Sequence, residues 1–161
     1  MLQLLGAELV DLGLERRLVG AELLARKDEV GRMLSREEGK PLANGIAETI
    51  RAAQIFKFFA QEALRLEGVA IASVRPGVDV TLTREPLGVV GLIAPWNFPI
   101  AIPAWKIAPA LCFGQRGRLQ ARRSGARHGL ALGRDRLRAG LPKGVFNLVM
   151  GRGSVVGQTL I

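Results

Sequence analysis

The feature that most constrains the fold is an unbroken apolar run from Val89 to Ala94, which ends at a turn between Pro95 and Pro99. The run has the length of one strand, and a strand without polar residues needs cover on both of its faces. Such strands are typical of parallel sheets that lie between two layers of helices. We therefore expect a central strand over residues 89–94.

Segments on either side of this run show the spacing of helices and of further strands. Helices are indicated over residues 16–35, 43–66 and 102–113. Residues 78–84 alternate as an exposed strand does, and residues 145–150 form a second buried run. Strands that alternate with helices indicate an α/β fold with a doubly wound parallel sheet. On the helix over residues 43–66, the side chains expected in the core are Ile46, Ile50, Ala53, Ile55, Phe58, Phe59 and Leu64.

Length and composition allow one globular domain and exclude several kinds of site. The chain has 161 residues, 48% of them hydrophobic, which is enough to bury a core. Its only cysteine is Cys112 and its only histidine is His128, so we expect neither a disulfide framework nor a Cys/His metal site. Glu8 and Asp11 interrupt the start where a signal peptide needs an apolar run, and four prolines divide the longest uncharged stretch, residues 86–105. These features predict a cytoplasmic protein with no metal and no membrane partner.

The positive charge is concentrated in one segment. The chain carries a net charge of +9, and residues 115–138 contain eight arginines against one aspartate. A basic tract can bind nucleic acid through the phosphates without sequence specificity. This tract has no aromatic residue on which a base could stack. A basic nucleic-acid-binding module is therefore an alternative, and no specific nucleic-acid partner is expected.

Asn97 is the candidate catalytic residue, because it lies at the carboxyl end of the predicted central strand. Ligands of open α/β sheets bind at that edge. The N–H of an asparagine amide is a neutral donor, which can stabilise the oxyanion that forms when a nucleophile attacks a carbonyl. The alternative from the residues alone is an asparagine that caps the next helix or holds the turn.

A second candidate site follows the strand over residues 145–150. Gly153 and Gly157 lie in a glycine-containing stretch whose spacing differs from the standard G-x-G-x-x-G dinucleotide motif. The start of a helix offers N–H groups and a positive dipole end to an anion such as a pyrophosphate. Glycines also occur in many ordinary turns between a strand and a helix, so both interpretations stay open.

Three stretches resemble the aldehyde dehydrogenase family almost residue for residue, and a fourth resembles the next characteristic stretch of that family's pattern. They read Arg-Glu-Pro-Leu-Gly-Val-Val-Gly at 84–91, Pro-Trp-Asn-Phe-Pro at 95–99, Trp-Lys-Ile-Ala-Pro-Ala-Leu at 105–111 and Ala-Gly-Leu-Pro-Lys-Gly-Val-Phe-Asn at 139–147. The resemblance implies a partial Rossmann-like cofactor domain with N-terminal helices. Residues 1–161 would then form the incomplete N-terminal NAD(P)-binding part of a longer enzyme.

The resemblance extends over residues 21–114 and 139–161. Within it, residues 37–40 and 73–77 look most like the branch that oxidises semialdehydes such as 2-oxoglutarate semialdehyde. The implied reaction converts an aldehyde to a carboxylate with NAD or NADP. A cysteine thiolate attacks the aldehyde, hydride leaves to the nicotinamide, and a glutamate activates water for hydrolysis. A small aldehyde is the implied partner, and intact members of the family are homo-oligomers.

The motifs also imply roles for individual residues. Asn97 matches the asparagine that holds the oxyanion. Ile93 and Trp96 match positions that line the dinucleotide site. Gly153 and Gly157 match the glycines where a helix start approaches the adenosine and pyrophosphate.

Cys112 is not expected to be the nucleophile. It lies at the apolar end of the helix over residues 102–113, where cysteines mostly behave as small hydrophobic residues. The family's reactive cysteine and general base lie beyond the position that matches Ile161. We therefore expect this chain alone to be inactive, and the alternative function is a non-catalytic fragment that associates with intact homologues.

Residues 115–138 depart from the family. At 115–123 the chain reads Gln-Arg-Gly-Arg-Leu-Gln-Ala-Arg-Arg, where the family has a strand of the form Asn-(Thr/Ala)-Val-Val-Phe-Lys-Pro-Ala-Glu. The codons CAA CGC GGT CGT CTT CAA GCC CGC CGA encode the observed residues, and one base later they read Asn-Ala-Val-Val-Phe-Lys-Pro-Ala and then Glu or Asp. We hypothesise that residues 115–138 are a frame-shifted segment, with one extra base near codon 114 and compensating changes before codon 139.

The frame-shifted segment affects the expected cofactor site. In the family, the lysine and glutamate of this motif hold the adenosine ribose or its 2′-phosphate, and Gln120 and Arg123 occupy their positions here. Glutamine lacks the charge, and arginine cannot accept hydrogen bonds from ribose hydroxyls. Arginine and glycine are also poor residues for a buried strand. We therefore assign cofactor binding to neither residue and expect the sheet to lack this strand.

Overall fold

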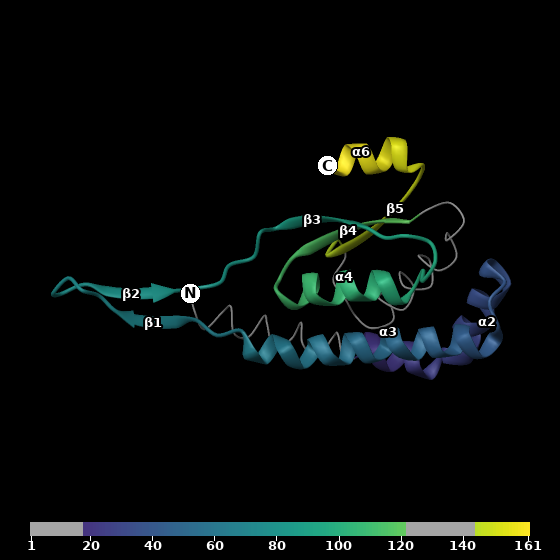
Figure 1. Ribbon diagram of the computed structural model, residues 1–161, viewed down its shortest axis with the longest axis horizontal. Helices are drawn as coiled ribbons and strands as arrows, with labels where there is room; N and C mark the ends of the chain where they lie inside the picture. The colour runs from purple at the N-terminus through teal and green to yellow at the C-terminus, as the bar shows by residue number, and fades with distance from the viewer. Residues whose placement is uncertain (1–17, 122–143) are drawn as a thin grey trace.

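The computed structural model describes residues 18–121 and 144–161 (Figure 1). Long helices lie along a small parallel sheet, and an antiparallel hairpin extends away from both. Residues 18–25 are also helical and lead into the first element. In chain order the elements are α2 (Lys27–Glu38), α3 (Leu42–Glu62), the 3-10 turn η1 (Ala63–Arg65), β1 (Val69–Ala72), β2 (Asp79–Leu82), β3 (Val89–Ile93), α4 (Ala101–Cys112), β4 (Arg116–Ala121), β5 (Phe146–Met150), the π-helical turn η3 (Gly153–Gly157) and α6 (Gln158–Leu160).

Helices α2 and α3 pack against each other through a pair of glycines. A Cβ atom added to Gly45 would lie 2.5 Å from the carbonyl oxygen of Gly31, so the two backbones are in direct contact. α2 ends at Gly39, whose φ of 74° is left-handed and whose N–H donates to the carbonyl oxygen of Ser35. These glycines let the chain reverse and bring α3 close to α2.

The predicted helix over residues 43–66 is confirmed in α3 and η1, but its predicted buried side is partly wrong. Phe58 and Leu64 are 52% and 66% exposed, whereas Phe56, which is absent from the predicted set, is 2% exposed. Successive residues on a helix are about 100° apart, so Phe58 lies roughly opposite Phe56. The stripe that packs against α2 and α4 includes Phe56, and hydrophobic character alone did not identify it.

Strands β3, β4 and β5 form a parallel sheet in that order. Figure 1 shows α4 and α6 on opposite sides of this sheet. The α/β prediction, with a partial doubly wound parallel sheet and N-terminal helices, is therefore confirmed. The core lies between the helices and the sheet, and its buried members are Val19, Leu23, Val30, Leu34, Ala52, Ala53, Ile55, Phe56, Leu92, Ile100, Ala104, Ile107, Ala108, Leu111 and Phe146.

The prediction that residues 89–94 form a central strand with both faces covered is wrong for the described sheet. β4 is the central strand, β3 lies at an edge, and Val89 and Ile93 are 64% and 41% exposed. The buried residue of β3 is Leu92, on the face that contacts α4. The apolar run therefore forms the predicted strand, but on the face opposite α4 it meets α6 only near Gly91 and stays largely exposed within the described residues.

The expectation that the arginine-rich sequence at residues 115–123 leaves the sheet without a strand is also wrong. Residues 116–121 form β4, which pairs with β3 and β5 along its length. Pairing uses backbone N–H and C=O groups, which arginine and glycine supply as well as valine does. Gly117 is buried, and a Cβ atom there would lie 3.3 Å from Cδ1 of Leu92. The remaining residues of the frame-shifted segment, 122–138, lie outside the described residues.

β1 and β2 form an antiparallel hairpin in which Val69 pairs with Leu82. The strand predicted over residues 78–84 is confirmed as β2, but its partner β1 was not predicted. Every residue of both strands is exposed, so the alternation in the sequence does not mark a buried face. None of the described helices is long and apolar enough to cross a membrane.

Candidate functional site

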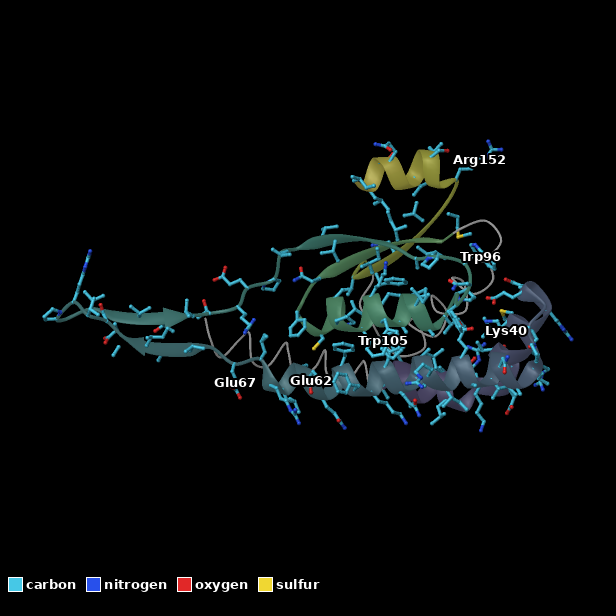
Figure 2. All side chains as sticks on the ribbon, in the orientation of Figure 1. Lys40, Glu62, Glu67, Trp96, Trp105 and Arg152 are labelled. Atoms are coloured by element: carbon cyan, nitrogen blue, oxygen red, sulfur yellow. The ribbon has the colours of Figure 1, made fainter. Side chains whose placement is uncertain are left out.

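The candidate site lies at the edge of the sheet where the parallel strands have their carboxyl ends. The register aligns Ile93 of β3 with Gln120 of β4, and Gln120 with Val149 of β5. Trp96 follows the end of β3 and Arg152 follows the end of β5, and Figure 2 shows both at the same end of the sheet. The two predicted clusters, one after β3 and one after β5, therefore lie at a common edge.

The turn between β3 and α4 exposes the predicted site residues. Trp96 is 58% exposed, and Asn97 is exposed as well. Among the described residues, none forms a hydrogen bond with the Asn97 side chain. The N-cap residue of α4 is Ile100, whose side chain forms no hydrogen bond with the helix. Within the described part of the chain Asn97 therefore does not cap α4, and its amide is accessible to a ligand.

The stretch after β5 begins with a single π-helical turn, η3. The carbonyl oxygen of Arg152 accepts the N–H groups of Val155 and Val156 at 3.0 and 2.9 Å. Gly153 at the start of the turn is exposed, and Gly157 at its end is buried. Gly153 therefore presents bare backbone at the carboxyl edge, whereas Gly157 packs inside.

A buried ionic cluster of Glu38, Lys40 and Glu48 contacts the end of the turn between β3 and α4. Glu48 of α3 has a side chain only 2% exposed, and its Oε2 accepts a hydrogen bond from Lys40 Nζ at 2.5 Å. Lys40 also pairs with Glu38 at 2.7 Å. The Oε1 atom of Glu48 accepts the N–H groups of Ile100 and Ala101 at 2.9 and 3.1 Å. The sequence interpretation missed this cluster, although a glutamate on the buried stripe of an amphipathic helix is a signal that could have revealed it.

The ionic state of this cluster follows from burial and from its hydrogen bonds. Burial raises the pKa of Glu38, and its hydrogen bond and attraction to Lys40 only partly oppose that rise. For Lys40, burial lowers the pKa, but the hydrogen bonds and the attraction of Glu38 and Glu48 outweigh burial, so its pKa is raised. Lys40 is therefore protonated at neutral pH and supplies a positive charge beside Glu48.

Another lysine contacts the end of β3. Lys106 of α4 donates from Nζ to the carbonyl oxygen of Ile93. The turn from Ala94 to Ile100 is therefore held at its beginning by Lys106 and at its end by Glu48. Trp96 and Asn97 lie between these two points.

The comparison that decides the family covers nearly the whole chain. The sequence model of the aldehyde dehydrogenase family matches residues 17–161 of this chain. The chain belongs to the aldehyde dehydrogenase family. Aldehyde dehydrogenases are oxidoreductases that use NAD or NADP, and the family predicted from the four sequence stretches is confirmed.

Relatives of this aldehyde dehydrogenase chain include enzymes named for a semialdehyde. It is 41% identical over 145 residues to the alpha-ketoglutarate semialdehyde dehydrogenase of Haloferax volcanii, covering 90% of this chain and 30% of the relative. It is 41% identical over 156 residues to the alpha-ketoglutaric semialdehyde dehydrogenase of Bacillus subtilis, covering 90% of this chain and 32% of the relative. The chain thus spans about a third of the length of these relatives.

Solved structures are similar to this aldehyde dehydrogenase chain over the same region. The betaine aldehyde dehydrogenase of Staphylococcus aureus, a point mutant in complex with NAD+, matches with a TM-score of 0.91 and 29% identity over 94% of this chain and 31% of that one. An NADP-dependent enzyme of E. coli matches with a TM-score of 0.90 and 33% identity over 92% of this chain and 31% of that one. The similarity extends to members named with either dinucleotide.

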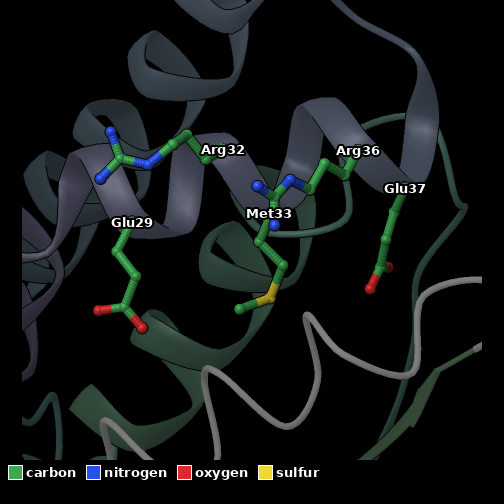
Figure 3. A pocket seen from close by; sticks show the side chains of 5 residues that line it. All are labelled: Glu29, Arg32, Met33, Arg36 and Glu37. Carbon is green, nitrogen blue, oxygen red and sulfur yellow. The ribbon is translucent and has the colours of Figure 1, made fainter.

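A surface pocket of this aldehyde dehydrogenase chain is lined by residues of α2. It is lined by Glu29, Arg32, Met33, Arg36 and Glu37, all on α2 (Figure 3). Glu29 is already engaged by Arg26 at 2.7 Å. The lining residues come from a single helix and include none of the predicted site residues, so we assign this pocket no part in the reaction.

Proposed function

We propose that the chain forms the N-terminal dinucleotide-binding and oxyanion-binding part of an NAD(P)-dependent aldehyde dehydrogenase that converts a semialdehyde to a carboxylate. The observation that carries this proposal is the placement of Asn97. Its side chain is exposed just beyond the carboxyl end of a parallel strand, and within the described residues it is engaged neither in a helix cap nor in another hydrogen bond. That edge is where α/β sheets bind their ligands.

Asn97 is proposed to stabilise the oxyanion. When a nucleophile attacks an aldehyde, the carbonyl oxygen gains negative charge, and an amide N–H directed at it lowers the barrier. The donor needs to be held in place before the reaction, because reorganisation during the reaction would reduce its effect. The contacts of Lys106 and Glu48 at the two ends of the turn favour this function.

The dinucleotide is proposed to lie across the same edge. When bound, it would accept the hydride that leaves the aldehyde carbon. Ile93 and Trp96 offer partly exposed apolar surface there, which suits a nicotinamide ring and excludes water from it. Gly153 has no side chain at the start of the turn after β5, so a phosphate group can approach its backbone. Gly157 is buried, so the cofactor contact that we propose for it rests on its position in the motif alone.

The residues of the proposed site match the nicotinamide end of the cofactor better than its adenosine end. The residues near Ile93 and Trp96 fit an apolar ring, whereas position 120, in register with Ile93, holds a glutamine that cannot supply the positive charge expected near the ribose. We propose that this mismatch arises from the frame-shifted segment, residues 115–138. Arg123, the other position concerned, lies outside the described residues.

The substrate class is proposed from the relatives. Two of them, each 41% identical to this chain, are named for alpha-ketoglutarate semialdehyde. We propose a small semialdehyde as the substrate, and a homo-oligomer as the state of the intact protein. The exposed hairpin of β1 and β2 is a described surface that remains available for such contacts.

The proposed function is tested with a chimera. In the chimera, residues 17–161 replace the matching part of the Bacillus subtilis relative. Residues 115–123 of the inserted part carry the family sequence Asn-Ala-Val-Val-Phe-Lys-Pro-Ala-Glu. We expect aldehyde-dependent reduction of NAD+ or NADP+ by the chimera. The 161-residue chain alone should give no NADH, because its only cysteine, Cys112, is 0% exposed within α4 and cannot attack an aldehyde.

The measurement is the absorbance of the reduced cofactor, with the intact Bacillus subtilis enzyme as the positive control. A folded chimera that neither binds dinucleotide nor oxidises the semialdehyde would contradict the proposed function. Clear NADH formation by the 161-residue chain alone would contradict the predicted inactivity.

A further inference from the structure

Glu48 is a buried carboxylate that links three segments far apart in the sequence. It lies on α3, its Oε2 atom contacts Lys40 just after α2, and its Oε1 atom contacts the start of α4 across 52 residues of sequence. A carboxylate whose side chain is 2% exposed is stable only when it is paired and hydrogen-bonded. Both of its oxygens meet that condition.

The contact of Glu48 with α4 acts as a helix cap that comes from another helix. The first N–H groups of a helix have no partner within it, and residues such as Asp, Ser or Asn just before the helix usually accept them. The cap position of α4 is Ile100, which has no side-chain acceptor. Glu48 accepts the N–H groups of Ile100 and Ala101 instead, and its negative charge lies at the positive end of the helix dipole.

Lys40 connects the same cluster to the turn itself. Its Nζ atom lies 5.0 Å from the centre of the Phe98 ring, within the range of a cation–π contact. Phe98 is adjacent to Asn97 in the sequence. Figure 2 shows Lys40 on the same side of the molecule as Trp96. The cluster therefore contacts the turn at Phe98 and at Ile100, directly after Asn97.

We propose that Glu48 is a positioning residue that fixes the orientation of Asn97 through the start of α4, with Lys40 as its counter-ion. This inference rests on the proposed function of Asn97 and adds the residues that hold it. Glu48 itself touches neither substrate nor cofactor in this proposal. Its removal would leave two N–H groups unsatisfied at the beginning of α4 and would allow the turn to move.

The test uses the 161-residue chain, labelled with nitrogen-15, and compares it with Glu48→Gln, Glu48→Asp and Lys40→Gln variants. In Glu48→Gln we expect hydrogen exchange at the amides of Ile100 and Ala101 to become about tenfold faster or more, because the charged acceptor is lost. The backbone and side-chain signals of Asn97 should shift in the same variant. Glu48→Asp keeps the charge, so the faster exchange and the shift of the Asn97 signals should both be smaller in this variant.

A matched control is Glu62→Gln, which changes a second glutamate of α3, one that is only partly buried and pairs with Arg65. It should leave the signals of Asn97 and the exchange of Ile100 unchanged. Amides in the middle of α3, such as that of Ala52, report whether a variant remains folded. If Glu48→Gln does not fold, Glu48→Asp gives the answer, because its shorter side chain withdraws the carboxylate from the N–H groups of Ile100 and Ala101. Lys40→Gln keeps the carboxylate cap and should move the Asn97 signals less than the Glu48 variants do.

The positioning role is overturned if a folded Glu48→Gln chain, or a folded Glu48→Asp chain where the first does not fold, leaves the Asn97 signals in place. Faster exchange at Ile100 with an unmoved Asn97 would mean that Glu48 only caps the helix. These readouts do not involve aldehyde oxidation. A chimera without activity would therefore contradict the proposed function and leave this result unaffected.

Discussion

Alanine at position 97 of the chimera is expected to lower kcat for semialdehyde oxidation about 100- to 1,000-fold, the range found when one oxyanion donor is removed from an enzyme. The amide of Asn97 would contact the oxygen most strongly when its negative charge has developed. Interactions that strengthen in the transition state change kcat more than KM. The loss should therefore appear in kcat, and KM for the aldehyde should change little.

The measurement is the steady-state rate of the chimera with and without Asn97→Ala. Asn44→Ala is a matched control, because Asn44 is an exposed asparagine on α3 and should not affect kcat. Asn97→Asp should be at least as harmful as Asn97→Ala, because a carboxylate repels the oxyanion. Full activity of a folded Asn97→Ala chimera would show that the side chain does not hold the oxyanion.

Leucine at position 45 should lower the free energy of unfolding of the chain by about 3 kcal/mol or more, as severe overpacking does. A Cβ atom on Gly45 would lie 2.5 Å from the Gly31 carbonyl oxygen and 3.2 Å from the Gly31 carbonyl carbon. Backbone atoms cannot rotate away as a side chain can, so α2 and α3 would have to separate. Separation would uncover Val30 and Leu34, both 0% exposed in the folded chain.

Urea unfolding followed by circular dichroism measures this effect. Ala47→Leu is the control on the same helix, because Ala47 is exposed and its replacement should change stability by no more than about 0.5 kcal/mol. Equal unfolding curves for Gly45→Leu and Ala47→Leu would show that the glycine contact does not determine how α2 and α3 pack.

The elements that could be predicted from the sequence are those with a strong local pattern. The apolar runs that form β3 and β5 and the helix that becomes α4 were found because hydrophobic spacing and flanking prolines are local signals. The edge position of β3 could not be predicted, because strand order depends on partners elsewhere in the chain. β4 was missed for a different reason, since its side chains argue against a strand while its backbone pairs normally.

The candidate site shows the same division. Asn97 was found because it follows a strand and lies in a recognisable motif. Glu48 and Lys40 were not found, because their contacts with Ile100 and Phe98 join residues that are distant in the sequence. The residues of the turn were thus accessible to pattern analysis, and the residues that hold the turn were not.

Mapping NAD+ onto the chain by nuclear magnetic resonance is the most direct test that the carboxyl edge of the sheet is the dinucleotide site. NAD+ is titrated into the 161-residue chain in which residues 115–123 carry the family sequence. We expect chemical-shift changes to concentrate at Ile93, Trp96, Gly153 and Gly157 and to leave the hairpin of β1 and β2 unchanged. Shifts that concentrate instead at the α2 pocket, around Arg32 and Arg36, would contradict the account.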